Sequence, residues 1–392
     1  MHILLITPTP SYHTEKFLRA LLDANYKVTL VTKHKPKLLD NEKYRYIRYP
    51  MSFGLRHLKL RLLKQLGNLI CALQLRIIWQ IVKPDLVHVH YIEDRALHCT
   101  WAGLHPLLFT CWGSDINSVF NTGSKNGIEW QNLAYALRSA DHITADSYAM
   151  LERCKAVAGQ KIPGSLFFFG IDTKRFKPGY ENEAQAWRQE LGIGLGTKVL
   201  VSVRSLRRYM GHHHVIESIA NIVNDSQMPN IALLLSGFGI ADSYQQELRA
   251  LVNELHLANN IYWLQEIPNE RMPILYSMAD VIVNYAEVDA FPVTFFETAA
   301  CKRPLITSML PDYADIFGPE SFLFVPPANV PALEKSIRLS LTESPDAQMQ
   351  RIDNAFAIVE RVGEWHQCFS SMQRIYTQLT NPQYNMEKPV FT

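Results

Sequence analysis

The sequence predicts an α/β protein with two doubly wound parallel sheets, and three observations support this fold class. Short apolar runs of strand length alternate with helical patterns from the N-terminus onward. A polar, turn-rich stretch at residues 168–183 interrupts this alternation, which then starts afresh. The chain has 392 residues, which is too long for one typical hydrophobic core, so two domains are expected.

The first half opens with a strand–helix–strand pattern. Residues 3–6 and 28–32 are apolar runs typical of buried strands, and residues 17–24 between them are predicted to form a helix. Further strands are predicted at residues 86–90, 106–111 and 141–144. A long helix is expected before Pro84, because leucine and isoleucine recur there every three or four residues. The proline is expected to end this helix. Its apolar face carries residues 55, 58, 62, 66, 69, 73, 77 and 81.

The second half repeats the alternation of strands and helices. Strands are predicted at residues 199–203, 231–235, 261–264, 281–283, 304–307 and 322–325, and helices at residues 331–341 and 354–379. We therefore expect an N-terminal domain at 1–170, a C-terminal domain at 171–365, and a final helix and tail at 366–392.

Composition is that of a globular protein, with 47% hydrophobic and 19% charged residues. The six cysteines are scattered without a C-x-x-C pair, which predicts reduced thiols and a cytoplasmic protein. The N-terminus has no basic leader, and no apolar run reaches about 18 residues, so neither a signal peptide nor a spanning helix is expected.

Charge is distributed unevenly along the chain. Nine Lys or Arg residues and no acid fall between Lys43 and Pro84, whereas the rest of the chain has 30 basic and 37 acidic residues. Four of these cations lie on the polar side of the long helix, and they suit an anionic membrane surface, an anionic glycan or simple solvation. They are Arg56, Lys59, Arg61 and Lys64. Nucleic acid is not an expected partner, because no binding motif accompanies this single patch.

The stretch at residues 280–304 carries the strongest functional signal. A buried strand is followed by a loop with Glu287 and Asp289, and Pro292 then introduces a helix that contains Glu297. A helix that starts at the carboxyl edge of a parallel sheet offers free backbone N–H groups to a phosphate. Flanking carboxylates accept hydrogen bonds from sugar hydroxyls. The stretch therefore suits a phosphorylated sugar or a nucleotide sugar, and the plain alternative is a surface loop beside an amphipathic helix.

With Asp289 and Glu297 in D-A-F-P-V-T-F-F-E-T-A-A, the second half resembles the donor-binding domain of family four glycosyltransferases, which are retaining enzymes of the GT-B fold. Further family landmarks follow in the expected order at residues 84–90, 169–172, 235–239 and 322–327. The resemblance implies two Rossmann-like doubly wound domains facing across a cleft, with the C-terminal helix crossing back to the first domain.

The resemblance also implies a donor pocket. Glu297 would accept hydrogen bonds from the ribose hydroxyls, and Asp289 would hold the transferred sugar and the β-phosphate. Family members usually have glutamate where Asp289 stands, so the donor sugar is expected either to sit differently or not to be a common hexose. The remaining donor-binding positions would use backbone N–H groups, close glycines and a border for the base. They are Phe291, Val293, Thr294, Gly237, Gly239, Gln265 and Ile267.

Arg204 follows the first strand of the second half, where the family uses arginine to neutralise the leaving diphosphate. The family also has a lysine before the following glycine, but here Met210 precedes Gly211. Arg207, Arg208 and His212 are close enough in sequence to replace it, and Arg208 is favoured. Arg207 and Arg208 could equally be a solvated loop pair.

On the acceptor side, Trp112 to Asp115 ends a strand of the first half as W-G-S-D, which resembles family members that build surface polysaccharides. Asp115 or His90 could steer the acceptor hydroxyl, and His90 could equally be a satisfied core residue. The resemblance implies no separate nucleophile and no metal. His212 to His214 are expected to point in different directions and to face solvent, so no metal site is predicted there.

These inferences combine into a retaining, metal-independent glycosyltransferase of the cytoplasm. It would move a sugar from a nucleotide diphosphate sugar, a co-substrate rather than a cofactor, to a glycan or lipid-linked acceptor in polysaccharide or glycoconjugate synthesis. Its position could be peripheral at the inner face of the membrane. One alternative is a sugar-nucleotide epimerase or phosphorylase on the same fold. The other is a degenerate transferase that binds nucleotide or glycan without turnover.

Overall fold

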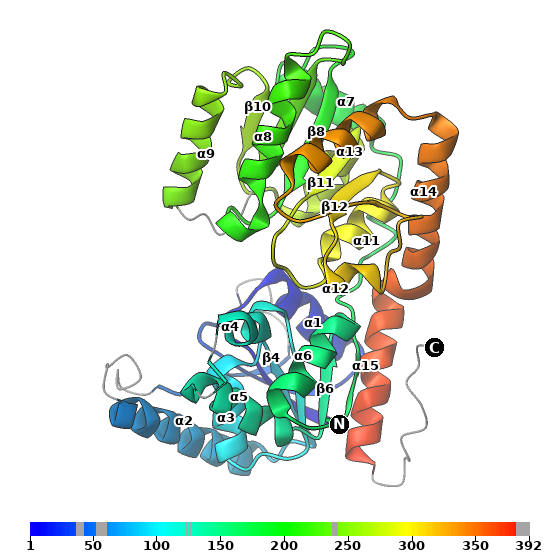
Figure 1. Ribbon diagram of the computed structural model, residues 1–392. Helices are drawn as coiled ribbons and strands as arrows, with labels where there is room; N and C mark the ends of the chain where they lie inside the picture. Colours follow the sequence, from blue (N-terminus) through cyan, green and yellow to red (C-terminus); the bar gives the residue numbers. More distant parts are fainter. Residues whose placement is uncertain (37–42, 52–60, 123, 126, 237–241, 382–392) are drawn as a thin grey trace. The chain divides into compact units, whose positions relative to one another are not determined.

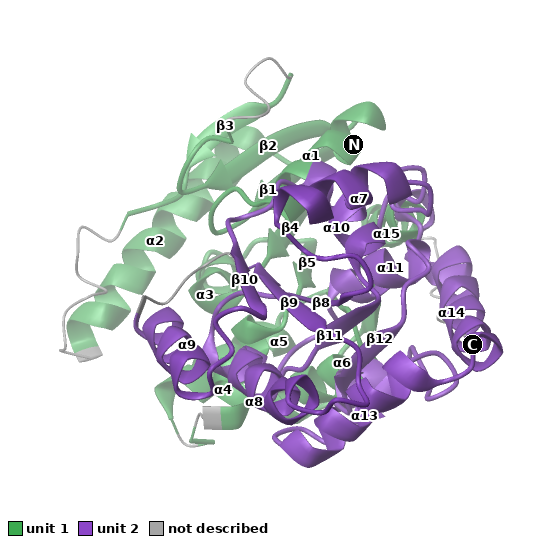
Figure 2. Ribbon diagram, turned by 90° about the horizontal axis from the view of Figure 1, so that it is seen from above, with its two compact units in different colours: residues 1–169, 368–392 green, residues 170–367 purple. Residues whose placement is uncertain are grey.

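The computed structural model describes residues 1–36, 43–51, 61–122, 124–125, 127–236 and 242–381 (Figure 1). The chain divides into two compact units, shown in two colours in Figure 2. Unit 1 comprises Met1–Phe169 and Cys368–Thr392, and unit 2 comprises Gly170–Gln367.

Unit 1 is built on a seven-stranded parallel sheet in the order β3-β2-β1-β4-β5-β6-β7. The central strands are fully buried because helices cover both faces, which explains their continuous apolar runs. The order reverses between β1 and β4, which pair side by side with Ile3 opposite Leu86. The strands are β1 (His2–Ile6), β2 (Lys27–Thr32), β3 (Arg45–Arg48), β4 (Leu86–His90), β5 (Leu107–Thr110), β6 (His142–Ala145) and β7 (Gly164–Leu166).

The helices of unit 1 connect successive strands or cover the sheet. The C-terminal helix is part of unit 1 from Cys368 onward. Its Tyr376 is buried, and the tyrosine hydroxyl forms a hydrogen bond with His88 Nδ1 at 2.7 Å. The helices are α1 (Tyr12–Asp23), α2 (Arg61–Val82), α3 (Glu93–Trp101), α4 (Ser114–Thr122), α5 (Ile128–Arg138), α6 (Tyr148–Ala158) and α15 (Trp365–Thr380).

Unit 2 repeats this plan with a six-stranded parallel sheet in the order β10-β9-β8-β11-β12-β13. Here the order reverses between β8 and β11, which pair with Leu200 opposite Val281. The strands are β8 (Lys198–Val203), β9 (Ile231–Ser236), β10 (Ile261–Leu264), β11 (Val281–Asn284), β12 (Leu305–Ser308) and β13 (Leu323–Val325). The predicted fold class is confirmed: both sheets are parallel and doubly wound.

Helices α8, α9 and α13 of unit 2 bury an apolar face in one core cluster with the sheet, which includes Ile216, Ile219, Leu248 and Ile337. The α-helices are α7 (Glu181–Glu190), α8 (His212–Val223), α9 (Asp242–Glu254), α10 (Met272–Met278), α11 (Val293–Ala300), α12 (Pro311–Ala314), α13 (Val330–Thr342) and α14 (Pro345–Ile358). Shorter helical turns are η2 (Arg208–Met210), η3 (Asn269–Arg271) and the π-helical η4 (Val359–Gly363).

The helix predicted at residues 354–379 is two helices, so that prediction is wrong in one respect. Between α14 and α15 the chain forms η4 and pairs with Ile171 through backbone hydrogen bonds at Gly363 and Trp365. Gly363 also lies against the Phe296 ring, where an added Cβ would be 2.8 Å from a ring carbon. This non-local contact interrupts a sequence pattern that favours one continuous helix.

The long helix α2 is present, but its predicted apolar face is turned to solvent. The leucines and isoleucines at positions 62, 66, 69, 73, 77 and 81 have exposed fractions between 45 and 85%. The opposite side of the helix is the buried one, with Asn68, Cys71, Ala72 and Leu75, and α2 packs against α3. By length and composition, residues Leu62–Val82 could cross a membrane, with a third of the segment buried in the protein. All six cysteines are free and buried.

Candidate active site

The reversal of strand order in unit 2 brings two charged side chains together. Arg204 directly follows β8, and Asp289 lies in the loop that follows β11. Because β8 and β11 are neighbours and parallel, both residues lie at the carboxyl edge of the sheet, at its topological switch point. In open α/β sheets this crevice is the usual place for a ligand.

Arg204 and Asp289 form an ion pair in which an Nη of Arg204 donates to Asp289 Oδ2. The Tyr313 hydroxyl donates to the same oxygen at 2.8 Å. Burial raises the pKa of Asp289, and the Arg204 guanidinium opposes that rise. Arg204 Nε is buried and has no hydrogen-bond partner among the described residues. The switch point therefore holds a desolvated cation with one donor direction left over.

Helix α11 begins next to this pair. Pro292 precedes its first residue in an extended conformation. As in any helix, the first backbone N–H groups have no partner within the helix itself. Thr294 lies in the first turn and its hydroxyl accepts from Asn284 Nδ2 at 3.1 Å, which ties the helix to the end of β11. Positive N–H ends and a nearby guanidinium make this edge attractive to an anion.

Glu297 lies one turn further along α11 and is buried. Its Oε2 accepts a hydrogen bond from the Tyr276 hydroxyl at 2.7 Å. Burial and the neighbouring carboxylate raise the pKa of Tyr276 well above its usual value, so the tyrosine stays a neutral donor. A carboxylate has several acceptor positions, so it suits a ligand that carries hydroxyls.

Of the other predicted donor-binding residues, some follow strands of this sheet or lie near the start of α11, and two are not described. Gln265 and Ile267 follow β10, with the Gln265 side chain exposed and its carbonyl accepting from Ser236 Oγ at 3.1 Å. Phe291 is buried, and its ring lies parallel to that of Phe317. Val293 is half-buried in the first turn of α11. Gly237 and Gly239 lie outside the described residues.

The loop after β8 lacks the lysine that the family resemblance predicts before Gly211. Met210 is buried instead, and Gly211 follows it with a φ of +69°. A side chain at Gly211 is impossible, since a Cβ there would lie 1.9 Å from the Tyr285 carbonyl oxygen. Arg208 is exposed and pairs with Glu247 of α9 at 2.5 Å.

Unit 1 has its own switch point, between β1 and β4, and a different chemistry there. His90 ends β4 and is fully buried, and neither ring nitrogen has a hydrogen-bond partner among the described residues. His13 Nδ1 and Trp112 Nε1 are also buried, and neither has a hydrogen-bond partner among the described residues. The three rings and Phe169 form one aromatic cluster with centroid separations of 5.1 to 5.9 Å.

Burial gives this cluster neutral imidazoles. It lowers the pKa of His90 to about 3 and that of His13 to about 4, and in each case a neighbouring cation or imidazole adds to the effect. Unpaired buried polar atoms cost free energy unless a ligand or water satisfies them. The cluster is thus a place where a hydroxyl-bearing molecule would gain hydrogen bonds.

Asp115 has a structural role in this geometry. Its carboxylate accepts from the backbone N–H groups of Ile92, Trp112 and Gly113 at 2.9 to 3.1 Å. It thereby holds the turn that presents Trp112. Burial nevertheless raises the pKa of Asp115 to about 6.

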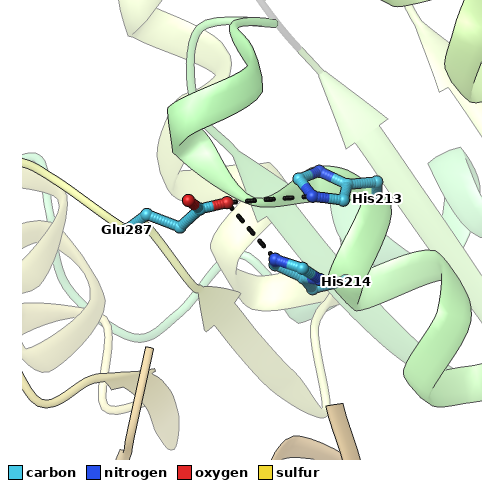
Figure 3. Close-up of side chains that lie close together, drawn as sticks. All are labelled: His213, His214 and Glu287. Atoms are coloured by element: carbon cyan, nitrogen blue, oxygen red, sulfur yellow. Dashed lines mark hydrogen bonds and ion pairs between the residues drawn. The ribbon is translucent and has the colours of Figure 1, made fainter. Parts of the chain in front are cut away.

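One group of side chains among the described residues is close enough to hold a metal ion: His213, His214 and Glu287. The predictions that the neighbouring histidines point apart and face solvent are wrong. Both rings are turned toward the Glu287 carboxylate (Figure 3) and are mostly covered. His212 is fully buried, with Nδ1 3.3 Å from Ser202 Oγ.

Sequence reasoning missed Tyr276, Tyr313 and His13. Each contacts the candidate groups from a distant part of the chain: Tyr313 is 24 residues from Asp289, and Tyr276 is 21 residues from Glu297. A tyrosine in an apolar stretch gives no local signal of such a partner. His13 could have been suspected because it closely follows the first strand of a doubly wound sheet, where ligands commonly bind.

Two family models match this chain. Residues 183–357 match the family described as Glycosyl transferases group 1, and residues 2–147 match that described as Glycosyl transferase 4-like. A curated relative is the D-inositol 3-phosphate glycosyltransferase of Corynebacterium jeikeium, 26% identical over 141 residues that cover 36% of this chain and 34% of the relative. The chain is thus aligned to about a third of the length of that protein.

Another relative is the GDP-mannose-dependent alpha-(1-6)-phosphatidylinositol monomannoside mannosyltransferase of Mycolicibacterium smegmatis, 26% identical over 144 residues, with 35% of this chain and 36% of the relative covered. Among solved structures, Anabaena HepE in complex with UDP has the same fold, with a TM-score of 0.76, 16% identity and coverage of 97% of this chain and 100% of HepE. Each unit thus matches a glycosyltransferase family model, group 1 in unit 2 and glycosyl transferase 4-like in unit 1, and the chain as a whole has the fold of HepE.

Proposed function

We propose that this protein is a retaining glycosyltransferase that takes a sugar from a nucleotide diphosphate sugar. The observation that carries the proposal is the buried Arg204–Asp289–Tyr313 group beside the start of α11, with Glu297 one turn away. Negative charge builds up on the leaving diphosphate as the sugar departs, and a fixed guanidinium in a desolvated site stabilises that charge. The relatives named as glycosyltransferases support the same activity.

In this proposal Arg204 turns from Asp289 toward the diphosphate, or reaches it through the unpaired Nε. Asp289 is then released to accept hydrogen bonds from the transferred sugar, and Glu297 accepts from the ribose. The leaving phosphate takes the proton of the acceptor hydroxyl, so the transfer step requires no protein nucleophile and no metal. Retention and metal independence rest on the family resemblance.

For the acceptor we propose a glycan or lipid-linked molecule that binds at the His90 cluster of unit 1. Neutral imidazoles and an indole N–H exchange hydrogen bonds with sugar hydroxyls, and aromatic faces cover the apolar faces of a sugar ring. The Mycolicibacterium smegmatis relative is named for a phosphatidylinositol mannoside acceptor, which supports a role in glycoconjugate or polysaccharide synthesis.

We further propose that the protein works at the surface of an anionic membrane, and that α2 is the element that touches it. The exposed stripe of leucine and isoleucine on α2 is what an interfacial helix buries in a bilayer, and its opposite side is already packed in the protein. Basic residues near its start suit anionic lipid. Of these, Lys64 pairs with Glu129 at 3.6 Å, the Arg61 side chain is not described, and Arg56 and Lys59 lie outside the described residues.

A nucleotide- or glycan-binding protein without turnover is the second candidate, because Met210 is buried where the family resemblance predicts a lysine. Incubation with a panel of UDP-, GDP- and ADP-sugars separates the two candidates, with free sugar and nucleoside diphosphate measured over hours. Slow hydrolysis of one donor supports the transferase. Tight nucleotide binding with no hydrolysis, and with no transfer to any acceptor offered, supports the binding protein. An exchange of one nucleotide sugar for its epimer would support the epimerase alternative.

A further inference from the structure

His213, His214 and Glu287 converge from two elements of unit 2. The histidines lie in the first turn of α8, and Glu287 lies in the loop after β11 (Figure 3). Glu287 Oε1 is 3.2 Å from His214 Nε2 and 3.7 Å from His213 Nε2. One ligand atom from each residue lies within 4.8 Å of those of the other two.

These separations fit a metal-binding group. A tetrahedral zinc ion with ligand bonds of about 2.0 to 2.2 Å holds its ligand atoms roughly 3.3 to 3.6 Å apart. The contact at 3.7 Å is too long for a hydrogen bond, so without an ion His213 Nε2 gains little from facing the carboxylate. Two imidazoles and one carboxylate are a ligand set that suits zinc and its neighbours among the late transition metals.

The outer ring nitrogens are held as metal-bound histidines usually are. His213 Nδ1 lies 2.8 Å from the Tyr244 hydroxyl, and His214 Nδ1 lies 3.4 Å from the Glu217 carboxylate. Such partners fix the tautomer so that Nε2 offers its lone pair to the ion. His214 thus has a carboxylate at each ring nitrogen, Glu217 at Nδ1 and Glu287 at Nε2.

We propose that His213, His214 and Glu287 bind a divalent transition-metal ion, with Zn²⁺ as the best-suited ion, and that water completes its coordination. The side chains are 15%, 15% and 37% exposed, so the open position faces solvent. The ion fastens the loop after β11 to the start of α8, where the Glu287 N–H already donates to the Tyr209 carbonyl at 2.8 Å. Asp289 is two residues further along this loop, so metal binding restrains the donor-site carboxylate. This consequence rests on the proposed function, whereas the metal binding does not.

The test is a calorimetric titration of tag-free, chelator-treated protein with Zn²⁺, together with the visible spectrum after Co²⁺ addition. We expect one Zn²⁺ per chain and the absorption bands of four- or five-coordinate Co²⁺. Zn²⁺ at a hundred times its Kd should also raise the melting temperature of unit 2 by roughly 5 to 10 °C. Absence of saturable Zn²⁺ binding to the wild-type protein would overturn the proposal without any need for a variant.

Three variants locate the ion. Glu287→Gln and His214→Ala should each weaken Zn²⁺ binding by more than tenfold, and Tyr244→Phe, which changes only an outer partner, by about tenfold. The control is His366→Ala, since His366 is an exposed histidine elsewhere in unit 2, and its Zn²⁺ affinity should equal that of the wild type. Unchanged affinity in Glu287→Gln and His214→Ala would place the ion elsewhere and contradict the assignment.

Nucleotide binding by the metal-free protein separates this inference from the proposed function. Zn²⁺ binding at this site in a protein that binds no nucleotide sugar upholds the metal site and refutes the transferase. The metal is expected to tighten the Kd for the nucleotide sugar severalfold. Equal donor affinity with and without Zn²⁺ would refute the restraint on Asp289.

Discussion

The two units place different chemistry at the same position of the same fold. In unit 2 the switch point carries opposite charges that satisfy each other, Arg204 against Asp289 with Tyr313 in support. In unit 1 the switch point carries neutral rings, His90, His13 and Trp112, whose buried nitrogens lack partners among the described residues.

This difference indicates how one fold can handle two substrates. A diphosphate needs fixed positive charge, and a buried ion pair keeps a guanidinium in place until the anion arrives. A sugar hydroxyl needs hydrogen-bond partners without net charge, and buried imidazoles supply them in neutral form. We therefore expect substitutions at the unit 2 site to lower activity by removing charge. For unit 1 we expect the free energy of unfolding to depend on pH.

Removing the cation of unit 2 is expected to have the largest effect. Arg204→Ala should lower turnover by about 100- to 1000-fold, as loss of one transition-state donor typically does. Nucleotide affinity should fall far less, because backbone N–H groups and Glu297 remain. Steady-state rates and a nucleotide titration measure the two effects.

The control for Arg204→Ala is Lys335→Ala, which removes an exposed cation of unit 2 far along the chain from the site. Its turnover should match that of the wild type. Equal losses of turnover and affinity in Arg204→Ala would mean that Arg204 only binds the donor, and the transition-state role would be refuted.

Unit 1 should lose stability in acid because of its buried imidazoles. The folded-state pKa of His90 is about 3, whereas an unfolded histidine has a pKa near 6.5, so below that pH the unfolded chain takes up the proton first. The free energy of unfolding is therefore highest above pH 6.5, where His90 is neutral in both states, and it decreases as the pH falls. His90 alone accounts for about 3 kcal/mol of unfolding free energy between pH 6.5 and 4.

Denaturant unfolding of the wild type and of His90→Leu at pH 7, 5.5 and 4 measures this effect. The variant should lose less stability on acidification than the wild type, although His13 continues to destabilise the folded state in the same direction. A His90 ring that titrates near pH 6.5 by NMR would show that the cluster is hydrated rather than buried.

The ribose contact in unit 2 should have an effect of intermediate size. Glu297→Gln keeps the shape of the side chain and an acceptor for the Tyr276 hydroxyl but removes the charge. Hydrogen bonds to a charged partner contribute about 1.5–3 kcal/mol, so nucleotide Kd should rise at least tenfold. Unchanged affinity, with an unchanged melting temperature to show an intact fold, would refute the donor pocket around Glu297.

The smallest effect is expected from the surface of unit 1. Serine at Leu69, Leu73 and Ile77 should reduce sedimentation with vesicles that contain anionic lipid by severalfold, with little loss of stability because these side chains are exposed. Leu339→Ser, an equally exposed leucine of unit 2, should sediment like the wild type. If the wild type fails to sediment, the membrane proposal is refuted.

The fold was largely predictable because its signals are local. Runs such as residues 3–6 and 281–283 are apolar on both faces, as strands between two helical layers must be. The side of α2 that would be buried was not predictable. The periodic leucines are exposed, and the helix packs through Asn68, Cys71, Ala72 and Leu75 on its other side, with α3 as its main neighbour.

The candidate site was predictable only in part. Asp289 and Glu297 follow from a strand end and a helix start, and Arg204 follows from the family resemblance. The structure brings Arg204 and Asp289 together. Their tyrosine partners depend on tertiary contacts that no spacing reveals. The same is true of His213 and His214, whose sequence positions on a helix suggest divergence but whose rings meet one carboxylate from a distant loop.

The most direct test of the central claim is a crystal structure of the protein with a bound nucleoside diphosphate. We expect the diphosphate at the first turn of α11, within hydrogen-bond distance of Arg204, and the ribose hydroxyls on Glu297. A nucleotide bound elsewhere, with the Arg204–Asp289 pair unchanged and the start of α11 empty, would contradict the account.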